Sequence, residues 1–305
     1  MSASTYYPGL PEDYAPRIHL GIVTATRRVG AGMLRITLGG HDMHDYPTTS
    51  VGDEYVRLFF PDRPEDDVRL PFATERGWDF ADGVAPSEMR TYTIRAHRPG
   101  EVDIDFVEHD GGIAAAWAAQ ARPGQQVGVN PPKALYDRPV WARRQILVAD
   151  EPALPAALRI AELTAADVPT TLVLEVRGTE HQLLPDAPGD AAEIVWLRGT
   201  GNGHAPSELA AAVRRADVAD DAYVWVASET RVTREIRTHL RRERSLPADA
   251  YKIVGYWTDR AEEWRERYDA LGEEFHNRVR ELYDSDRETE EIVDEVQRLY
   301  EAAGL

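Results

Sequence analysis

The segments QILVAD at residues 145–150 and TTLVLEV at residues 170–176 decide the fold. Each is a continuous apolar run of the kind that a parallel strand buried on both faces requires. Between them, residues 153–164 carry helical spacing and good helix formers. The same alternation continues through residues 193–198, 207–216, 223–228, 229–242 and 251–257. It predicts a Rossmann-like parallel α/β domain.

Upstream, the chain has a different pattern of short β-rich segments separated by turns. In VDIDFVE, the side chains of Val102, Ile104 and Phe106 share one face, while Asp103 and Asp105 point the other way. Similar segments are RIHLGIVTATRRV, MLRITL, DEYVRLFF and RTYTIRA. Their spacing predicts a closed antiparallel β-barrel or a sandwich, with residues 61–88 as a long excursion between strands.

The C-terminal part is acidic and helical in pattern. Residues 259–305 hold 16 acidic and 7 basic residues, a net charge of −9. Apolar residues spaced by three or four predict two amphipathic helices that break at residues 284–286, with Ser285 and Glu288 as a capping box. We therefore expect domains at residues 1–138 and 139–258, and a helical extension at 259–305 that packs on the α/β domain or on a second subunit.

Composition excludes several classes of function. The 305 residues include 35 basic and 53 acidic ones, and the resulting charge of −18 argues against binding nucleic acid or a membrane surface. The absence of cysteine removes disulfides, thiolate catalysis and iron–sulfur ligation. His41 and His44 lack a third partner, so no metal site is predicted. No signal peptide or membrane span is apparent, which favours the cytoplasm, and the oligomeric state stays open.

Several motifs follow one another in a characteristic order. They are Arg-x-Tyr-Thr at residues 90–93, Asp-Phe-Val-x-His at 105–109, Gly-x-Ala-x-x-Trp at 112–117, Ala-Asp-Glu-x-Ala-Leu-Pro at 149–155 and Gly-Tyr-Trp at 255–257. In this combination, from about residue 17 to 257, the chain resembles the siderophore-interacting protein family. The members are FAD-containing ferric-siderophore reductases of the ferredoxin-reductase superfamily.

The resemblance implies a flavin site on the barrel. Tyr92 would stack on the isoalloxazine, Thr93 would hydrogen-bond its reactive edge, and Arg90 would supply positive charge. Further contacts implied for the ribityl, diphosphate and adenine groups are Asp105, Val107, His109, Gly112, Ala114, Ala115 and Trp117. Ala115 replaces the serine usual in the family, so phosphate binding would depend on backbone N–H groups.

The α/β half would receive the electron donor. The resemblance implies a donor site at the carboxyl end of the sheet, formed by Asp150, Glu151, Ala153, Leu154, Pro155, Glu229, Tyr256 and Trp257. The Gly-x-Gly-x-x-Gly fingerprint is absent, Pro152 stands in place of a threonine, and Ser228 stands in place of a glycine. NADPH, NADH or a reduced ferredoxin therefore remain open as the donor. The glycine-rich residues 199–203 are expected to form a flexible surface loop.

Substrate binding is an electrostatic problem for this chain. Ferric siderophores are often anionic, so a protein with a charge of −18 needs a local cation to bind them. The resemblance implies Lys252 for this role, and strand position suggests Arg57 and Arg95 as further candidates.

The expected activity is the transfer of electrons from NAD(P)H through FAD to siderophore-bound Fe(III), with no side chain acting as acid, base or nucleophile. Hard oxygen donors bind Fe(III) better than Fe(II), so reduction releases the iron for assimilation. Two alternatives stay open: a flavin reductase or electron-transfer oxidoreductase with a non-siderophore acceptor, and a non-catalytic siderophore-binding protein.

Overall fold

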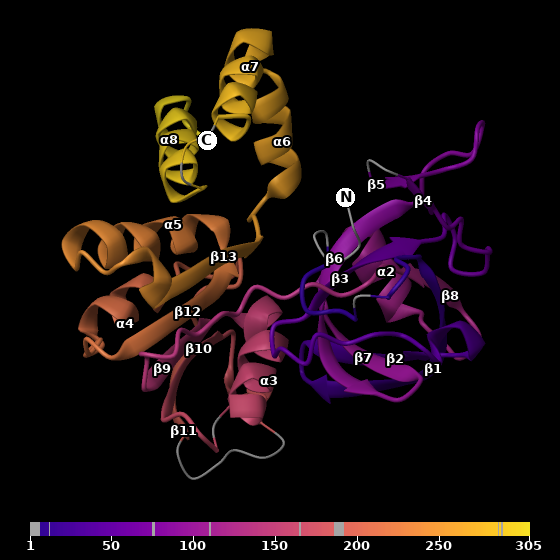
Figure 1. Cartoon of the computed structure of the whole chain (residues 1–305), viewed down its shortest axis with the longest axis horizontal. Coiled ribbons are helices and arrows are strands. Elements are labelled where there is room, and N and C mark those ends of the chain that lie inside the picture. The colour runs from indigo at the N-terminus through magenta and orange to yellow at the C-terminus, as the bar shows by residue number, and fades with distance from the viewer. Residues whose placement is uncertain are drawn as a thin grey trace.

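A computed structural model of the chain describes residues 7–11, 13–74, 77–109, 111–164, 166–185, 192–285, 287 and 289–305. A β-barrel and an α/β domain lie side by side, and a helical extension lies above the α/β domain in this view (Figure 1). The predicted fold class, an antiparallel barrel followed by a parallel α/β sheet, is confirmed. None of the helices in the described part of the chain has the length and apolar character that crossing a bilayer requires.

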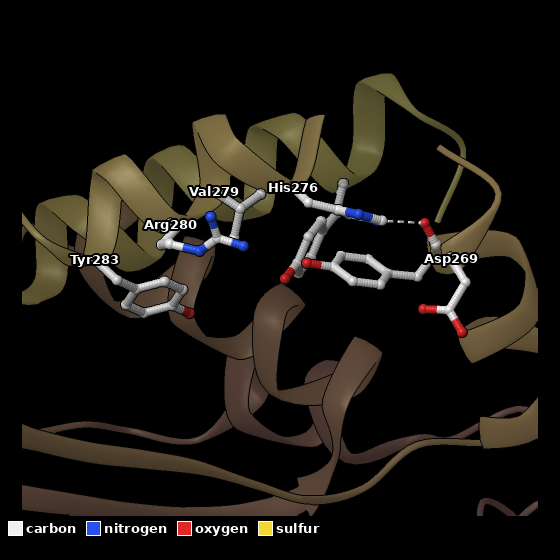
Figure 2. A pocket seen from close by; sticks show the side chains of 7 residues that line it. Asp269, His276, Val279, Arg280 and Tyr283 are labelled. Carbon is white, nitrogen blue, oxygen red and sulfur yellow. Dashed lines mark hydrogen bonds between the residues drawn. The ribbon is translucent and has the colours of Figure 1, made fainter. Parts of the chain in front are cut away.

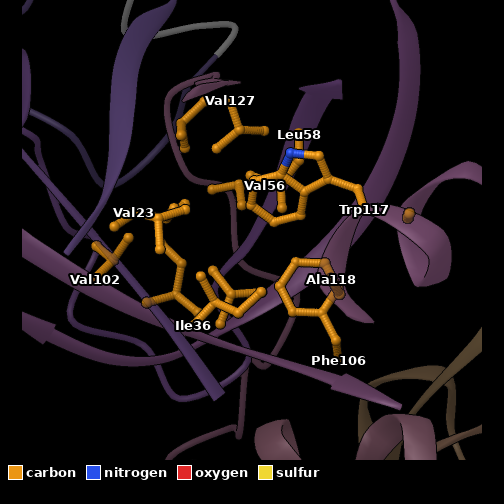
Figure 3. Packing of buried hydrophobic residues seen from close by; sticks show 14 of the residues in the cluster. Val23, Ile36, Val56, Leu58, Val102, Phe106, Trp117, Ala118 and Val127 are labelled. Atoms are coloured by element: carbon orange, nitrogen blue, oxygen red, sulfur yellow. The ribbon is translucent and has the colours of Figure 1, made fainter. Parts of the chain in front are cut away.

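Six antiparallel strands close the barrel in the order β1–β2–β7–β6–β3–β8. Its interior is apolar because alternate residues of each strand point inward, and the helix α2 (Ile113–Ala119) plugs one end with Trp117 (Figure 3). The strands are β1 (His19–Gly30), β2 (Met33–Gly39), β3 (Tyr55–Phe60), β6 (Glu88–Arg98), β7 (Glu101–Val107) and β8 (Gln126–Val129).

The alternation predicted in β7 is confirmed on its inner face. Val102, Ile104 and Phe106 are buried in the barrel core. The outer face of β7 carries two aspartates, which would suggest contact with solvent, but both residues are buried. Arg35 on β2 binds Asp105 with both Nε and Nη2, at 2.6 and 2.8 Å, and Arg98 binds Asp103. Cross-strand ion pairs therefore bury these carboxylates.

The excursion at residues 61–88 contains structure that the sequence did not reveal. A short hairpin of β4 (Phe72–Thr74) and β5 (Gly77–Asp79) forms within it. Arg69 links the two ends of the excursion, because its guanidinium donates both to the Asp62 carboxylate and to the Ala85 carbonyl.

The α/β domain is a five-stranded parallel sheet in the order β11–β10–β9–β12–β13. Leu147 and Ala149 on β9 face α3, which lies between the sheet and the barrel, whereas Ile146 and Val148 face α4 and α5. Burial on both faces explains why these strands are apolar throughout. The elements are β9 (Arg144–Ala149), α3 (Leu154–Thr164), β10 (Thr170–Val176), β11 (Ala192–Arg198), α4 (Leu209–Arg215), β12 (Ala222–Glu229), α5 (Thr230–Thr238) and β13 (Tyr251–Trp257).

The extension has three helices where the sequence predicted two. They are α6 (Ala261–Asp269), α7 (Gly272–Tyr283) and α8 (Thr289–Ala302). Gly272 has a φ of 79°, a left-handed conformation that interrupts the predicted first helix. Val279, Ile292 and Val296 form a small core of their own. The predicted capping box lies partly outside the described residues, because Glu288 is not among them.

The extension packs on the α/β domain of the same chain, which is one of the two expected arrangements. Asp294 on α8 lies 2.9 Å from Arg241 and 3.7 Å from Arg242, both in the π-helix His239–Glu243 that follows α5. Arg280, His276 and Tyr283 line a hollow of about 440 Å³ in the extension (Figure 2). All residues that line it belong to α6, α7 and α8, so it is separate from the junction of the two domains.

Candidate functional site

The two faces of β6 serve different domains. Tyr92 and Ile94 point towards the barrel core, and the Tyr92 ring packs on Phe106 with centroids 4.3 Å apart. On the opposite face, Thr93 and Arg95 reach the α/β domain, as the alternation predicts. This strand therefore carries the predicted flavin residues to the place where the two domains meet.

Two of these residues remain accessible. Arg90 is exposed and donates to the Glu88 carboxylate and the Met89 carbonyl. Tyr92 is half-buried, and burial raises the pKa of its phenol, which stays neutral. Together they present one aromatic surface and one exposed cation at the edge of the barrel.

The turn before α2 leaves its backbone open. Gly111 and Gly112 have φ values of 85° and 80°, and a Cβ added to Gly111 would meet nothing within 4 Å. His109 is exposed and Val107 is half-buried beside this turn. A ligand could therefore approach the glycine backbone closely.

Several predicted cofactor contacts are structural instead. Ala114, Ala115 and Trp117 are buried against the barrel core, so their side chains do not face a ligand and only the backbone of this turn is available. The Asp105 carboxylate has no exposed surface and is bound by Arg35, so its side chain is already engaged and only its backbone is left for the predicted contact. The core signal was present in the sequence, because this helix is made almost wholly of Ala and Trp.

Buried ion pairs fix the barrel to α3. Arg159 donates to Glu54 at 2.6 Å and to the Ile94 carbonyl at 2.7 Å. Arg95 binds both oxygens of Glu162 and is only 3% exposed, so its predicted role in substrate binding is wrong. A Cβ on Gly52 would lie 2.5 Å from the Ile160 backbone, which shows how closely the two domains pack.

Asp53 is a junction residue that the sequence did not single out. Its carboxylate accepts from the Leu135 backbone N–H at 3.0 Å and from the Trp225 indole at 3.1 Å. Burial raises the pKa of this carboxyl, while the nearby charge of Lys252 lowers it. Asp53 therefore links the barrel, the interdomain connection and the β12–β13 edge of the sheet.

The cationic candidates lie on both sides of the junction. Lys252 is half-buried and makes no hydrogen bond or ion pair with any residue that the structure describes. Arg57 is exposed on the barrel and lowers the pKa of Lys133, whose ammonium lies 5.0 Å from the centre of the Tyr7 ring. Lys133 was missed in the sequence, although it is one of only two lysines.

Asp150 follows β9 at the carboxyl edge of the sheet, beside β12, where the strand order reverses. Asp150 is 1% exposed there, and its Oδ2 accepts from Ser228 Oγ, Glu229 N–H and Trp257 Nε1 at 2.8, 2.9 and 2.7 Å. Burial raises the pKa of this carboxyl to about 7, and the Glu175 charge adds to the effect. Open α/β sheets bind ligands at such a reversal.

The glycine-rich residues 199–203 are not the flexible loop that was expected. The Thr200 hydroxyl donates to Glu175, and Asn202 both accepts from the Glu151 backbone N–H and donates to the Glu175 carbonyl. A Cβ on Gly201 would overlap the Glu175 carboxylate. Glu175 on β10 and the backbone of Glu151, in the turn after β9, therefore anchor the loop beside Asp150.

The remaining donor candidates divide into two groups. Tyr256 lies against Thr93 across the junction and packs edge-on against Trp225 at 6.4 Å. The other group supports the fold. Glu151 binds Arg177, and Glu229 caps the start of α5. Ala153 and the first residues of α3, Leu154 and Pro155, have buried side chains, so their place in the donor site stays a prediction about the backbone.

Two family models match the two domains of this chain. A siderophore-interacting FAD-binding domain matches residues 22–136, and a siderophore-interacting protein domain matches residues 142–260. The chain is 31% identical to the NADPH-dependent ferric-chelate reductase of Escherichia coli, over 77% of this chain and 91% of that protein. It is 30% identical to the ferric vibriobactin reductase ViuB of Vibrio cholerae, over 81% and 93%.

A solved structure gives the same result. The crystal structure of a siderophore utilization protein from T. fusca superposes with a TM-score of 0.70 at 31% identity, over 80% of this chain and 94% of that one. The two matched domains are the barrel and the parallel sheet described above, and the resemblance inferred from the motifs is confirmed. The chain belongs to the siderophore-interacting protein family.

Proposed function

We propose that this chain is a cytoplasmic FAD-dependent reductase that transfers electrons from NAD(P)H to the Fe(III) of an anionic siderophore. The observation that carries the proposal is the position of Lys252. This cation has no ion-pair partner among the described residues of a chain with a net charge of −18, and it lies at the junction beside Asp53. The ferric-chelate and ferric vibriobactin reductases named above support the same activity.

The barrel residues fit a flavin nucleotide. The half-buried Tyr92 offers a ring face, Thr93 offers a hydroxyl at the junction, and the exposed Arg90 offers a cation. The open backbone at Gly111 and Gly112 fits the approach of a diphosphate. Bound FAD would supply the conversion between a two-electron donor and a one-electron acceptor.

The other residues would orient the substrates. Lys252 would attract the anionic ferric complex against the field of the whole protein, helped by Arg57 and Lys133 from the barrel side. Asp53 would hold the Lys252 ammonium near the junction by charge, while the Leu135 N–H and the Trp225 indole keep the carboxylate in place. No side chain needs to move a proton, because Fe(II) is released by the weaker binding of hard oxygen donors.

The donor is proposed to be a nicotinamide nucleotide. The carboxyl ends of β9 and β12 lie at the reversal of strand order, where such ligands bind in open α/β sheets. The choice between NADH and NADPH, and the alternative of a reduced ferredoxin, are decided by experiment.

The test is the visible spectrum of the purified protein. We expect flavin absorbance that bleaches anaerobically with NADH or NADPH and returns when a ferric catecholate is added. Bleaching with no return on any ferric siderophore would favour a flavin reductase with another acceptor. A flavin that neither nucleotide nor reduced ferredoxin bleaches would favour a non-catalytic binding protein.

A further inference from the structure

The C-terminal extension contains a hollow that the proposed reaction does not use. Its volume of about 440 Å³ lies within the range of about 300–1,000 Å³ that is usual for small-molecule sites. Three tyrosines from three helices line it, namely Tyr268 on α6, Tyr283 on α7 and Tyr300 on α8. All three follow residue 260, where the match to the second family model ends. The family resemblance therefore assigns no role to this hollow.

Aromatic rings form the walls of the hollow. Tyr268 and Tyr300 meet edge to face with ring centroids 6.0 Å apart, and the His276 ring stacks on Tyr268 at 4.6 Å. A hydrogen bond of 2.9 Å between the His276 ring and the Tyr268 carbonyl fixes this stack (Figure 2). Burial and the neighbouring phenols raise the pKa of Tyr300 to about 12, so its hydroxyl stays neutral. These walls suit a planar aromatic ring.

Two arginines at the hollow have no carboxylate partner. Arg280 lines the hollow and donates to the Asn277 side-chain oxygen at 2.9 Å. Arg234 on α5 lies over the Tyr300 ring, with its guanidinium 5.5 Å from the ring centre. Neither arginine forms an ion pair with any residue that the structure describes. Because residues 259–305 carry a net charge of −9, these two cations create a local site for an anion.

The two ends of the hollow differ in charge. Arg280 and Asp269 lie on opposite sides of His276 (Figure 2). The Asp269 carboxylate is exposed and has no hydrogen bond or ion pair with a described residue. An acid group would therefore bind at Arg280 and be repelled from Asp269, whereas a hydroxyl group could donate to Asp269.

We propose that this hollow binds a small aromatic carboxylate with a ring hydroxyl opposite its acid group. The carboxylate forms paired hydrogen bonds with the Arg280 guanidinium, the ring packs against the tyrosines, and the hydroxyl donates to Asp269. A bare anion such as phosphate would use Arg280 but gain nothing from the aromatic walls. The site is separate from the junction of the two domains, so the inference does not depend on the proposed function.

The experiment is isothermal titration calorimetry of the full-length flavoprotein at neutral pH. The probes are 4-hydroxybenzoate, benzoate, which lacks the hydroxyl, and cyclohexanecarboxylate, which keeps the charge but lacks the aromatic ring. We expect 4-hydroxybenzoate to bind with a Kd below about 1 mM. Benzoate should bind about fivefold more weakly because it loses the hydrogen bond to Asp269, and cyclohexanecarboxylate about tenfold more weakly.

Three variants separate the two ends of the hollow. Arg280→Gln should weaken binding of 4-hydroxybenzoate about tenfold. Its matched control is Arg278→Gln, which should leave binding unchanged, because Arg278 lies on the same helix but does not line the hollow. Asp269→Ala should remove the preference for 4-hydroxybenzoate over benzoate without weakening benzoate. All three residues are exposed, so the variants should fold, and circular dichroism checks this.

Lys252→Gln distinguishes the hollow from the junction, where an anion is also expected to bind. It should leave the binding of 4-hydroxybenzoate unchanged. The proposal is overturned if wild type does not bind this probe or binds cyclohexanecarboxylate equally well. It is also overturned if Lys252→Gln loses binding while Arg280→Gln keeps it, if Arg278→Gln costs as much as Arg280→Gln, or if Asp269→Ala keeps the preference. The return of flavin absorbance with a ferric catecholate uses none of these probes, so the proposed function fails or stands separately.

Discussion

The α/β domain meets its two neighbours in different ways. Towards the barrel, its contacts are buried: Arg159 and Glu54 have side chains 8% and 0% exposed, and Gly52 packs directly on the α3 backbone. Towards the C-terminal extension, its contacts are partly exposed, as at Arg242 and Asp294. Of the residues proposed for chemistry, Thr93, Asp53 and Lys252 lie at the junction with the barrel. The difference indicates that buried contacts hold the barrel and the sheet in fixed positions, whereas the described contacts of the extension are more exposed.

The largest expected effect is the loss of the buried ion pair. Arg159→Met should lower the free energy of unfolding by about 3–5 kcal/mol, because Glu54 would stay buried without its cation. Urea denaturation at pH 7 measures this. The control is Arg144→Met, since Arg144 pairs with Asp221 at the surface and should cost under about 1 kcal/mol. Equal costs for the two variants would show that the junction is not specially stabilised.

A second effect comes from the carboxyl group of Asp150, which is buried at the carboxyl edge of the sheet. The pKa of Asp150 in the folded chain is about 7, above its ordinary value of 3.8, so the folded state holds the proton more tightly. Its contribution to stability is full below pH 4 and is lost as the pH rises through 7. Between pH 5 and 8.5, wild type should lose about 2–3 kcal/mol more than Asp150→Asn in urea denaturation. Parallel pH profiles for the two proteins would contradict the raised pKa.

The fold could be predicted well from the sequence where burial leaves a periodic signal. The apolar runs of β9 and β10 and the alternation in β7 each matched the structure. The tail was predicted less well, because the break at Gly272 lies within an otherwise continuous apolar stripe and depends on one backbone angle. The hairpin within residues 61–88 has strands of three residues, too short to leave a pattern.

The site could be predicted only in part, because partners decide what a side chain is free to do. Arg95 and Lys252 look equivalent as lone cations in the sequence, but Arg95 has Glu162 opposite it across the junction and Lys252 has no such carboxylate within bonding distance. Asp53 gave no signal, since its partners Leu135 and Trp225 come from segments 82 and 172 residues away. Long-range pairing of this kind is absent from local sequence.

A third, smaller effect should appear at Lys252. Lys252→Gln should weaken binding of an anionic ferric tris-catecholate about tenfold, which corresponds to about 1.4 kcal/mol, and should reduce the dependence of binding on salt. Titration of the oxidised protein, followed by fluorescence quenching, measures it. An uncharged ferric hydroxamate is the matched ligand and should bind both proteins alike. If both ligands lose affinity equally, Lys252 acts through packing and the electrostatic role is refuted.

The smallest effect tests the contact between the α/β domain and the C-terminal extension. Asp294→Asn should loosen the extension by about 1 kcal/mol, because Asp294 is 14% exposed and faces both Arg241 and Arg242. Hydrogen exchange of α8 backbone amides should accelerate about fivefold, with no change in α3. Glu291→Gln, on the same helix and paired only with Arg287 at the surface, should leave exchange unchanged. Flavin content and the rate of reoxidation by a ferric catecholate should stay as in wild type, because none of the junction contacts described above comes from the described residues of α6, α7 or α8. If loosening α8 also slowed that reaction, the extension would belong to the same rigid unit as the barrel and the sheet, and the contrast between the two contacts would not hold.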